Sequence, residues 1–176
     1  MKVLIVGGGG REHAIAWKLS QNPKVEKIYT AAGNAGIDLL EKGECINLKT
    51  VDEILEFAAE KFGTKLVVVL GHSHCGAVTA CVETLINPDQ QFSPNLRSIV
   101  DRIRPSVYNL HEIYTANGQD MDVQELIERG TKANVRMSVS QLKHGSRILE
   151  DAVSAGNLLI VGAVYDLDTG EVRFLD

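Results

Sequence analysis

The chain has 176 residues, enough for one domain with a sizeable core, and its 44% hydrophobic and 23% charged residues are typical of a folded globular protein. The net charge of −5, without any basic cluster, argues against nucleic-acid binding. The longest apolar run, Leu66–Leu70, is too short to cross a bilayer, so we expect no membrane partner. Three cysteines do not make a disulfide framework, and we therefore expect a reducing cytoplasm and a metal-binding or catalytic use.

The first part of the chain alternates short apolar runs with helical patterns. The runs are rich in Val, Ile and Leu, as in strands that are buried on both faces of a parallel sheet. Strands are predicted at 2–6, 27–31 and 65–70, a short edge strand at 44–48, and helices at 11–21 and after Thr50, which has the capping partner Glu53. The alternation predicts right-handed βαβ units and an α/β fold, a Rossmann-like three-layer sandwich with a mainly parallel sheet.

Helical patterns dominate after the third predicted strand. The predicted C-terminal helices cover 76–85, 94–104, 107–114, 122–144 and 146–155, with a break at Pro105 between the second and the third. Apolar runs at 157–164 and 171–175 flank Asp168-Thr169-Gly170, a hairpin signal. The chain is therefore expected to end in an antiparallel hairpin.

A glycine run, Gly7-Gly8-Gly9-Gly10, separates the first predicted strand from the first helix and is followed by Arg11. Backbone N–H groups of such a run can bind a phosphate-type anion at a helix N-terminus, which makes Gly8, Gly9, Gly10 and Arg11 candidate residues. The run also fits a tight turn that needs glycine only for its dihedral angles.

The wider wording of this region is informative. MKVLIVGGGGREHAIAWKLSQNPKV, followed by TAAGNAGI, resembles the N-terminal domain of the phosphoribosylamine–glycine ligases over about residues 1–50. Ala32 stands where that family usually has proline. The resemblance implies a Rossmann-like lobe that helps to hold a phosphoribosyl substrate. The ATP-grasp domain that performs ligation does not follow, so we expect no ligase activity.

A second motif, Gly71-His72-Ser73-His74-Cys75-Gly76, follows the third predicted strand. A histidine at the end of a strand and a cysteine in the first turn of the next helix can bind one zinc ion. The same pattern fits a buried thiol beside a solvated histidine.

Three separated segments resemble β-class carbonic anhydrases over roughly residues 60–176: GTKLVVVLGHSHCGAVTACVE, NVRMSVSQL and NLLIVGAVYDLDTGEVRFL. The resemblance implies a β-carbonic anhydrase-like fold and makes His72 and Cys75 two of three protein ligands of a zinc ion. It further implies that zinc activates water for the conversion of CO2 to bicarbonate, and that the chain forms a homodimer or a higher oligomer.

The sequence departs from this family at the third zinc ligand. The family supplies that ligand from a Cys-x-Asp-x-Arg segment after its first strand, whose aspartate and arginine also control the fourth zinc position. If Arg11 overlies the family's arginine, Gly7 and Gly9 stand where cysteine and aspartate belong. The zinc site is therefore expected to be incomplete.

Two neighbouring side chains are alternative third ligands. Glu12 and His13 lie in the same loop and could complete the coordination. Cys45 is expected to be remote from the motif, Cys81 to pack in the core, and His74 to be solvated.

The two resemblances meet at about residues 49–65, without a Pro-, Gly- or Ser-rich linker. AGNAG is also similar to the RNAGN segment of carbonic anhydrases. We therefore expect a single α/β domain, 1–176, that is an engineered chimera, with its first and third strands side by side and Gly8 near His72. Three alternative functions are left: an impaired zinc lyase, a folded chimera without activity, and an anion-binding module. For catalytic turnover of CO2 we favour the chimera without activity.

Overall fold

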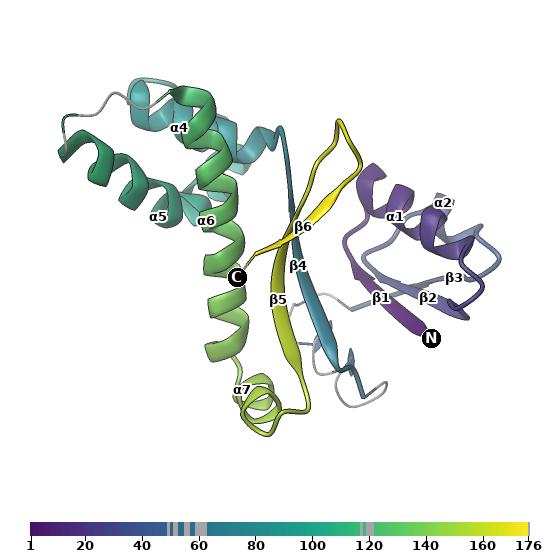
Figure 1. The fold of residues 1–176 in the computed structure, drawn as a ribbon. Coiled ribbons are helices and arrows are strands. Elements are labelled where there is room, and N and C mark those ends of the chain that lie inside the picture. The colour runs from purple at the N-terminus through teal and green to yellow at the C-terminus, as the bar shows by residue number, and fades with distance from the viewer. Residues whose placement is uncertain are drawn as a thin grey trace. The chain divides into compact units, whose positions relative to one another are not determined.

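A computed structural model describes residues 1–48, 50, 53–54, 57–58, 63–116, 118 and 122–175 (Figure 1). The chain divides into two compact units, Met1–Lys65 and Leu66–Asp176, and each is described by itself. The boundary coincides with the end of the segment 49–65 in which the two sequence resemblances meet. Whether the chain behaves as the single domain expected from the sequence stays a prediction.

The first unit is a small parallel sheet with short helices. Its elements are β1 (Lys2–Val6), α1 (Gly10–Ser20), β2 (Lys27–Ala31), α2 (Ala35–Asp38) and β3 (Gly43–Ile46). The three strands pair in the order β1-β2-β3, all parallel. Apolar side chains of α1 and the sheet form the core of this unit, around Ala16, Val25, Ile28 and Ile37. The predicted strands are confirmed, whereas the short helix α2 was missed.

The capping box predicted at Thr50 is present. The Thr50 backbone N–H donates to Glu53 Oε2 and the Glu53 N–H donates to Thr50 Oγ1, both at 3.2 Å. Of the described apolar residues that follow, Ile54 and Ala58 are buried and Phe57 is half-buried. The rest of this predicted helix lies outside the described residues.

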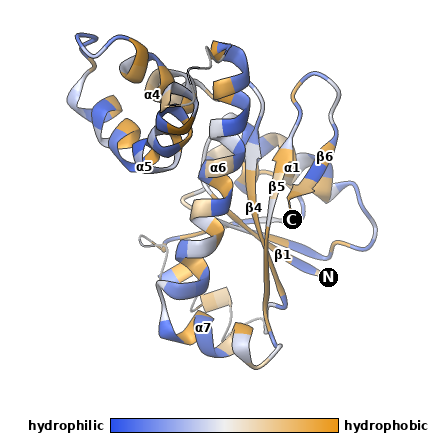
Figure 2. Cartoon of the chain, turned by 60° about the vertical axis from the view of Figure 1, so that its left-hand side comes forward, coloured by the Kyte–Doolittle hydropathy of each residue, from blue (hydrophilic) through white to orange (hydrophobic). Residues whose placement is uncertain are grey.

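The second unit joins a mixed sheet to a group of helices. Its elements are β4 (Leu66–His72), α4 (Gly76–Ile86), α5 (Pro94–Ala116), α6 (Val123–His144), α7 (Arg147–Ser154), β5 (Leu159–Tyr165) and β6 (Val172–Leu175). Figure 1 shows α6 lying along the sheet and reaching the helices α4 and α5 at its other end. In Figure 2, α5 and α6 carry blue and orange stretches, which is the pattern of amphipathic helices. No helix of the described segments is long and apolar enough to span a membrane.

The main core of the second unit lies between α4, α5 and α6. It is built from Val78, Ala80, Cys81, Val82, Val100, Ile103, Val107, Leu126 and Ile127. Cys81 is fully buried in this cluster, which confirms its predicted packing role.

The strands of the second unit pair in the order β4-β5-β6, with β4 parallel and β6 antiparallel to β5. The C-terminal hairpin is therefore confirmed. Within the two units, β1 pairs with β2 and β4 pairs with β5, so the expectation that the strand at 2–6 lies beside the strand at 65–70 stays a prediction. The related expectation that Gly8 lies near His72 stays a prediction, since each unit is described by itself.

The predicted break at Pro105 is wrong, because α5 continues through this proline. A proline inside a helix loses a backbone hydrogen bond and crowds the preceding turn. Here the residues on both sides, Ile103 and Val107, are buried in the core between the helices. The Ser106 hydroxyl also donates to the Ile103 carbonyl oxygen at 2.7 Å. Packing along the whole helix thus outweighs the local cost of proline.

Candidate functional site

The loop between β4 and α4 holds the two candidate zinc ligands. His72 is the last residue of β4, Cys75 is the residue that precedes α4, and both are half-buried. His72 pairs with Tyr165 at the end of the parallel ladder between β4 and β5. The loop therefore lies at the carboxyl end of two parallel strands, where α/β folds commonly bind ligands.

The ring of His72 is oriented by the backbone beside it. Its Nδ1 lies 2.8 Å from the Ser73 carbonyl oxygen. Because a carbonyl oxygen only accepts hydrogen bonds, Nδ1 must carry the hydrogen, and the lone pair of the neutral ring is then on Nε2. Histidines that bind metals usually hold the second ring nitrogen in this way, so the contact fits a role as a zinc ligand.

Cys75 is placed by packing. Its side chain lies against the apolar cluster of α4, α5 and α6. With His72 it supplies nitrogen and sulfur donors, the ligand types that zinc prefers.

The residues between the two candidates attach the loop to the β5–β6 hairpin. The Ser73 N–H donates to the Tyr165 carbonyl oxygen at 2.9 Å, and the Leu167 N–H donates to Ser73 Oγ at 2.8 Å. His74 Nε2 lies 2.9 Å from Asp168 Oδ2. This hydrogen bond and the charge of Asp168 raise the pKa of His74 above its ordinary value.

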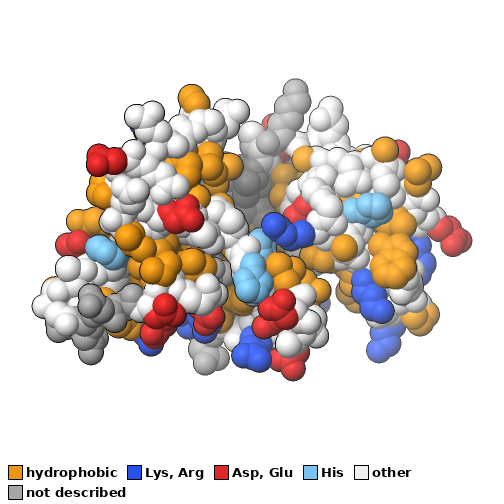
Figure 3. All heavy atoms as spheres, turned by 90° about the horizontal axis from the view of Figure 1, so that it is seen from above, with side chains coloured by type: hydrophobic (Ala, Val, Ile, Leu, Met, Phe, Trp, Pro, Cys, Tyr) orange, Lys and Arg blue, Asp and Glu red, His pale blue; other side chains and the backbone are white. Residues whose placement is uncertain are grey.

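The His74 side chain is 56% exposed, which agrees with the predicted solvation, but the sequence reasoning missed its carboxylate partner. Histidine side chains reach the surface on the face drawn in Figure 3. The signal that could have suggested the contact is the parallel pairing of β4 and β5, because the loop after His72 and the hairpin turn after Tyr165 then begin at the same edge of the sheet.

The donor set for zinc is incomplete among the residues that the structure describes. No three His, Cys, Asp or Glu side chains in that part of the chain are grouped so as to hold a metal ion. A catalytic zinc site needs three protein ligands. That His72 and Cys75 are two ligands of such a site stays a prediction, and among the described residues of their own unit no third donor is grouped with them.

Glu12 and His13, the alternative third ligands, and Cys45 have other contacts within the first unit. Glu12 Oε2 accepts a hydrogen bond from the Gly9 N–H at 2.7 Å. The ring of His13 lies against Gly36, where an added Cβ would be 2.4 Å from His13 Cε1. Cys45 Sγ lies 3.5 Å from the Asn34 carbonyl oxygen.

The glycine run forms a tight turn held by protein groups. Asn34 Nδ2 donates to the Gly8 carbonyl oxygen at 2.9 Å, and the Glu12 carboxylate takes the N–H of Gly9. An added Cβ at Gly8 would lie 2.1 Å from the Ala32 carbonyl oxygen, and Gly7 has a φ of +129°. Backbone conformation accounts for Gly7 and close approach for Gly8, whereas a Cβ at Gly10 would meet nothing within 4 Å. Phosphate binding by Gly8, Gly9, Gly10 and Arg11 finds no support.

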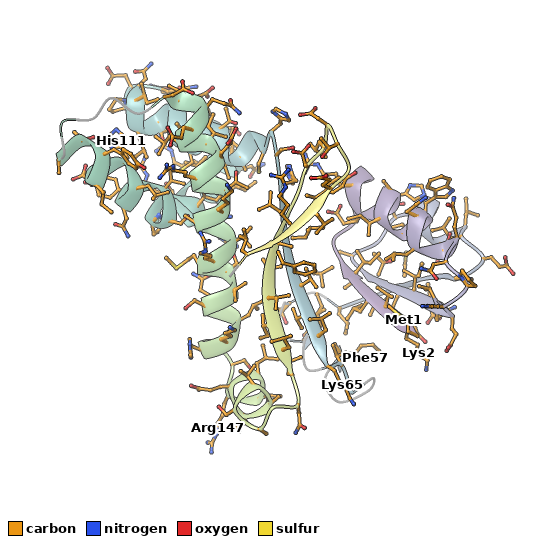
Figure 4. All side chains as sticks on the ribbon, in the orientation of Figure 1. Met1, Lys2, Phe57, Lys65, His111 and Arg147 are labelled. Carbon is orange, nitrogen blue, oxygen red and sulfur yellow. The ribbon has the colours of Figure 1, made fainter. Side chains whose placement is uncertain are left out.

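The other two histidines of this unit lie outside the loop between β4 and α4. His111 lies on α5 (Figure 4), and its Nδ1 has no hydrogen-bond partner among the described residues. His144 is exposed at the end of α6, 3.6 Å from Glu150 Oε1.

Solved structures of β-carbonic anhydrases share this fold. A tetrameric enzyme of Sordaria macrospora superposes with a TM-score of 0.67 at 20% identity, covering 99% of this chain and 79% of that chain. The enzyme CafA of Aspergillus fumigatus gives a TM-score of 0.63 at 24% identity, covering 99% and 74%. The β-carbonic anhydrase-like α/β fold expected from the sequence is confirmed.

Curated proteins of a second family match about a third of the chain. The phosphoribosylamine–glycine ligase of Fusobacterium nucleatum is 64% identical over 61 residues, which is 35% of this chain and 14% of the ligase. That of Caldanaerobacter subterraneus is 58% identical over 62 residues, again 14% of the ligase. The chain spans about one seventh of the length of these relatives.

The family model described as carbonic anhydrase matches residues 32–172. The match begins before residue 60, where the sequence resemblance was placed. The segment AGNAG at 32–36, similar to the RNAGN segment of carbonic anhydrases, agrees with this earlier start. Since the match covers well over half of the chain, this protein belongs to the carbonic anhydrase family.

Proposed function

We propose that the chain is a chimera derived from a β-class carbonic anhydrase, with an incomplete zinc site and impaired hydration of CO2. The observation that carries the proposal is the loop after β4, where His72 and Cys75 remain as metal donors without a third described donor grouped with them. Zinc in this family supplies an activated water for the conversion of CO2 to bicarbonate.

The residues of the chain support binding of zinc more than catalytic hydration of CO2. The Ser73 carbonyl fixes the hydrogen of His72 on Nδ1, which leaves Nε2 for a metal. In the sequence register set by Arg11, Gly7 and Gly9 have no side chain to donate. Since the free energy of zinc binding comes from the full ligand set, we expect affinity lower by several kcal/mol than in a complete site.

The chimera origin is supported by the two kinds of relative. Ligases match about a third of the chain at high identity, whereas the carbonic anhydrase model covers residues 32–172. An oligomer of identical subunits is proposed by analogy with the tetrameric enzyme of Sordaria macrospora. The anion-binding alternative is not proposed, because Glu12 already occupies the N–H of Gly9.

The test measures metal content and hydration separately. Purified protein is titrated with zinc against a chelator of known affinity, and CO2 hydration is followed by stopped flow. We expect weak zinc binding that is lost in His72→Ala and in Cys75→Ser, and hydration near the buffer background. The matched controls are His144→Ala and Cys45→Ser, which remove an exposed imidazole and an exposed thiol elsewhere. Tightly bound stoichiometric zinc with hydration well above background would contradict the proposal.

A further inference from the structure

We propose that Asp168 is a positioning residue for the loop that carries His72 and Cys75. It acts with Ser73 and His74 in a set of contacts that we call the hairpin latch. The latch joins two segments that are 94 residues apart in sequence. This inference rests on the proposed function, because it concerns the same two metal-binding side chains.

The first part of the latch extends the sheet. The ladder between β4 and β5 ends at the pair His72 and Tyr165, and the Ser73 N–H continues it by donating to the Tyr165 carbonyl oxygen at 2.9 Å. The Ser73 hydroxyl then accepts from the Leu167 N–H at 2.8 Å. Both the backbone and the side chain of Ser73 are therefore held by the hairpin, immediately after His72.

The second part holds an unfavourable backbone conformation. His74 has a φ of +53°, in the left-handed region that side chains with a Cβ rarely adopt. This conformation turns the chain between His72 and Cys75. In this conformation His74 Nε2 lies 2.9 Å from Asp168 Oδ2, and a contact made in the left-handed conformation offsets part of its cost.

The hairpin tip is itself well ordered by local hydrogen bonds. Asp166 Oδ1 accepts from the N–H groups of Asp168 and Thr169, both at 2.9 Å. The Gly170 N–H donates to the Asp166 carbonyl oxygen at 2.9 Å. Asp168 is thus presented by a preorganised turn, so its carboxylate can fix the position of His74.

Exposure separates a positioning role from a general contribution to stability. The side chains of His74 and Asp168 are 56% and 75% exposed, and exposed ion pairs contribute little to global stability. Loss of the carboxylate is therefore expected to change the loop while leaving the unfolding midpoint nearly unchanged.

The experiment compares Asp168→Ala, Asp168→Asn and Glu150→Gln in a Cys45→Ser background, which removes an exposed thiol. The asparagine variant keeps an oxygen acceptor for His74. Glu150→Gln is the control, because it removes the carboxylate from another exposed histidine, His144. Amide exchange of metal-free protein and Cd²⁺ binding, followed by thiolate-to-metal absorption, are measured on each. His72→Ala shows which absorption belongs to the loop.

In Asp168→Ala we expect the Leu167 amide to exchange about two- to fivefold faster and Cd²⁺ affinity to fall by a similar factor. Amides in the middle of β5 should not change, the asparagine variant should recover part of both effects, and Glu150→Gln should show neither. Unchanged exchange at Leu167, or faster exchange with unchanged Cd²⁺ affinity, would overturn the positioning role. Failure of the parent protein to bind Cd²⁺ would instead overturn the proposed metal site, and this inference with it.

Discussion

Gly162 lies in β5 where α6 crosses the sheet, and adding a methyl group there tests how closely the helix packs. A Cβ at Gly162 would lie 2.7 Å from Val135 Cγ1 and 3.4 Å from Val139 Cγ2. Carbon atoms in favourable contact are about 3.5–4.0 Å apart, so Val135 and the new methyl group must separate by roughly 1 Å. Val135 is only 3% exposed and has little room to move.

The expected magnitudes follow from these distances. Overpacking of a core costs about 1–3 kcal/mol, and replacing glycine in a strand recovers about 0.5–1 kcal/mol. We therefore expect Gly162→Ala to lower the free energy of unfolding by about 1 kcal/mol, within a range of about 0–2.5 kcal/mol. Val135→Ala removes two buried methyl groups and should cost about 2 kcal/mol, including the cavity. In the double variant the new methyl group occupies the vacated space, so the two costs should not add.

Urea unfolding followed by circular dichroism measures the four proteins of this cycle, with unchanged m-values as the condition for comparing midpoints. We expect the double variant to be at least about 1 kcal/mol more stable than the sum of the single effects predicts. The control is Gly76→Ala, since a Cβ at Gly76 would meet nothing within 4 Å. Additivity within about 0.5 kcal/mol would refute the close packing of α6 on β5.

Two further predictions concern single turns. Ala32 is exposed and has a φ of +63°, so Ala32→Gly should raise the free energy of unfolding by about 1 kcal/mol in the same urea assay. Ala32→Pro introduces the residue that is usual in the ligases and should lower the free energy of unfolding, because proline fixes φ near −65°. A stabilising proline would contradict the left-handed turn. Hydrogen bonds from the backbone N–H groups of Thr169 and Asp168 hold the pKa of Asp166 below its ordinary value. Its stabilisation is therefore present above the unfolded pKa near 4 and is lost as pH falls through the lower folded pKa. The stability difference between the parent and Asp166→Ala should shrink between about pH 4 and pH 2, and a difference that stays constant over this range would show that the carboxylate is not involved.

The incomplete zinc site that we propose is consistent with how zinc ligands are distributed along the chain in this family. His72 and Cys75 are close in sequence and lie in one loop, so a segment carrying them keeps both. The third ligand of the family comes from another strand, so in the proposed chimera a replacement of that strand would remove this ligand without disturbing the loop. If Arg11 overlies the family's arginine, Gly7 and Gly9 stand at the positions of the family's cysteine and aspartate and bring no donor side chain.

The sequence by itself determined the local elements. Apolar runs at 2–6, 27–31 and 65–70 predicted strands, the Thr50–Glu53 pair predicted a capping box, and Asp168-Thr169-Gly170 predicted a hairpin. These signals are local because backbone dihedral angles, side-chain capping and burial on both strand faces depend on residues that are near in sequence. The motif with His72 and Cys75 was found in the same way.

Only the tertiary structure decided which strands pair, whether α5 survives Pro105, and which carboxylate meets His74. β4 pairs with β5, α5 runs through Pro105 because Ile103 and Val107 are buried on both sides of it, and Asp168 reaches His74 from 94 residues away. These outcomes depend on energies shared between distant segments: core burial can exceed the local cost of a proline, and a hydrogen bond across a sheet edge exists only once both strands are in register.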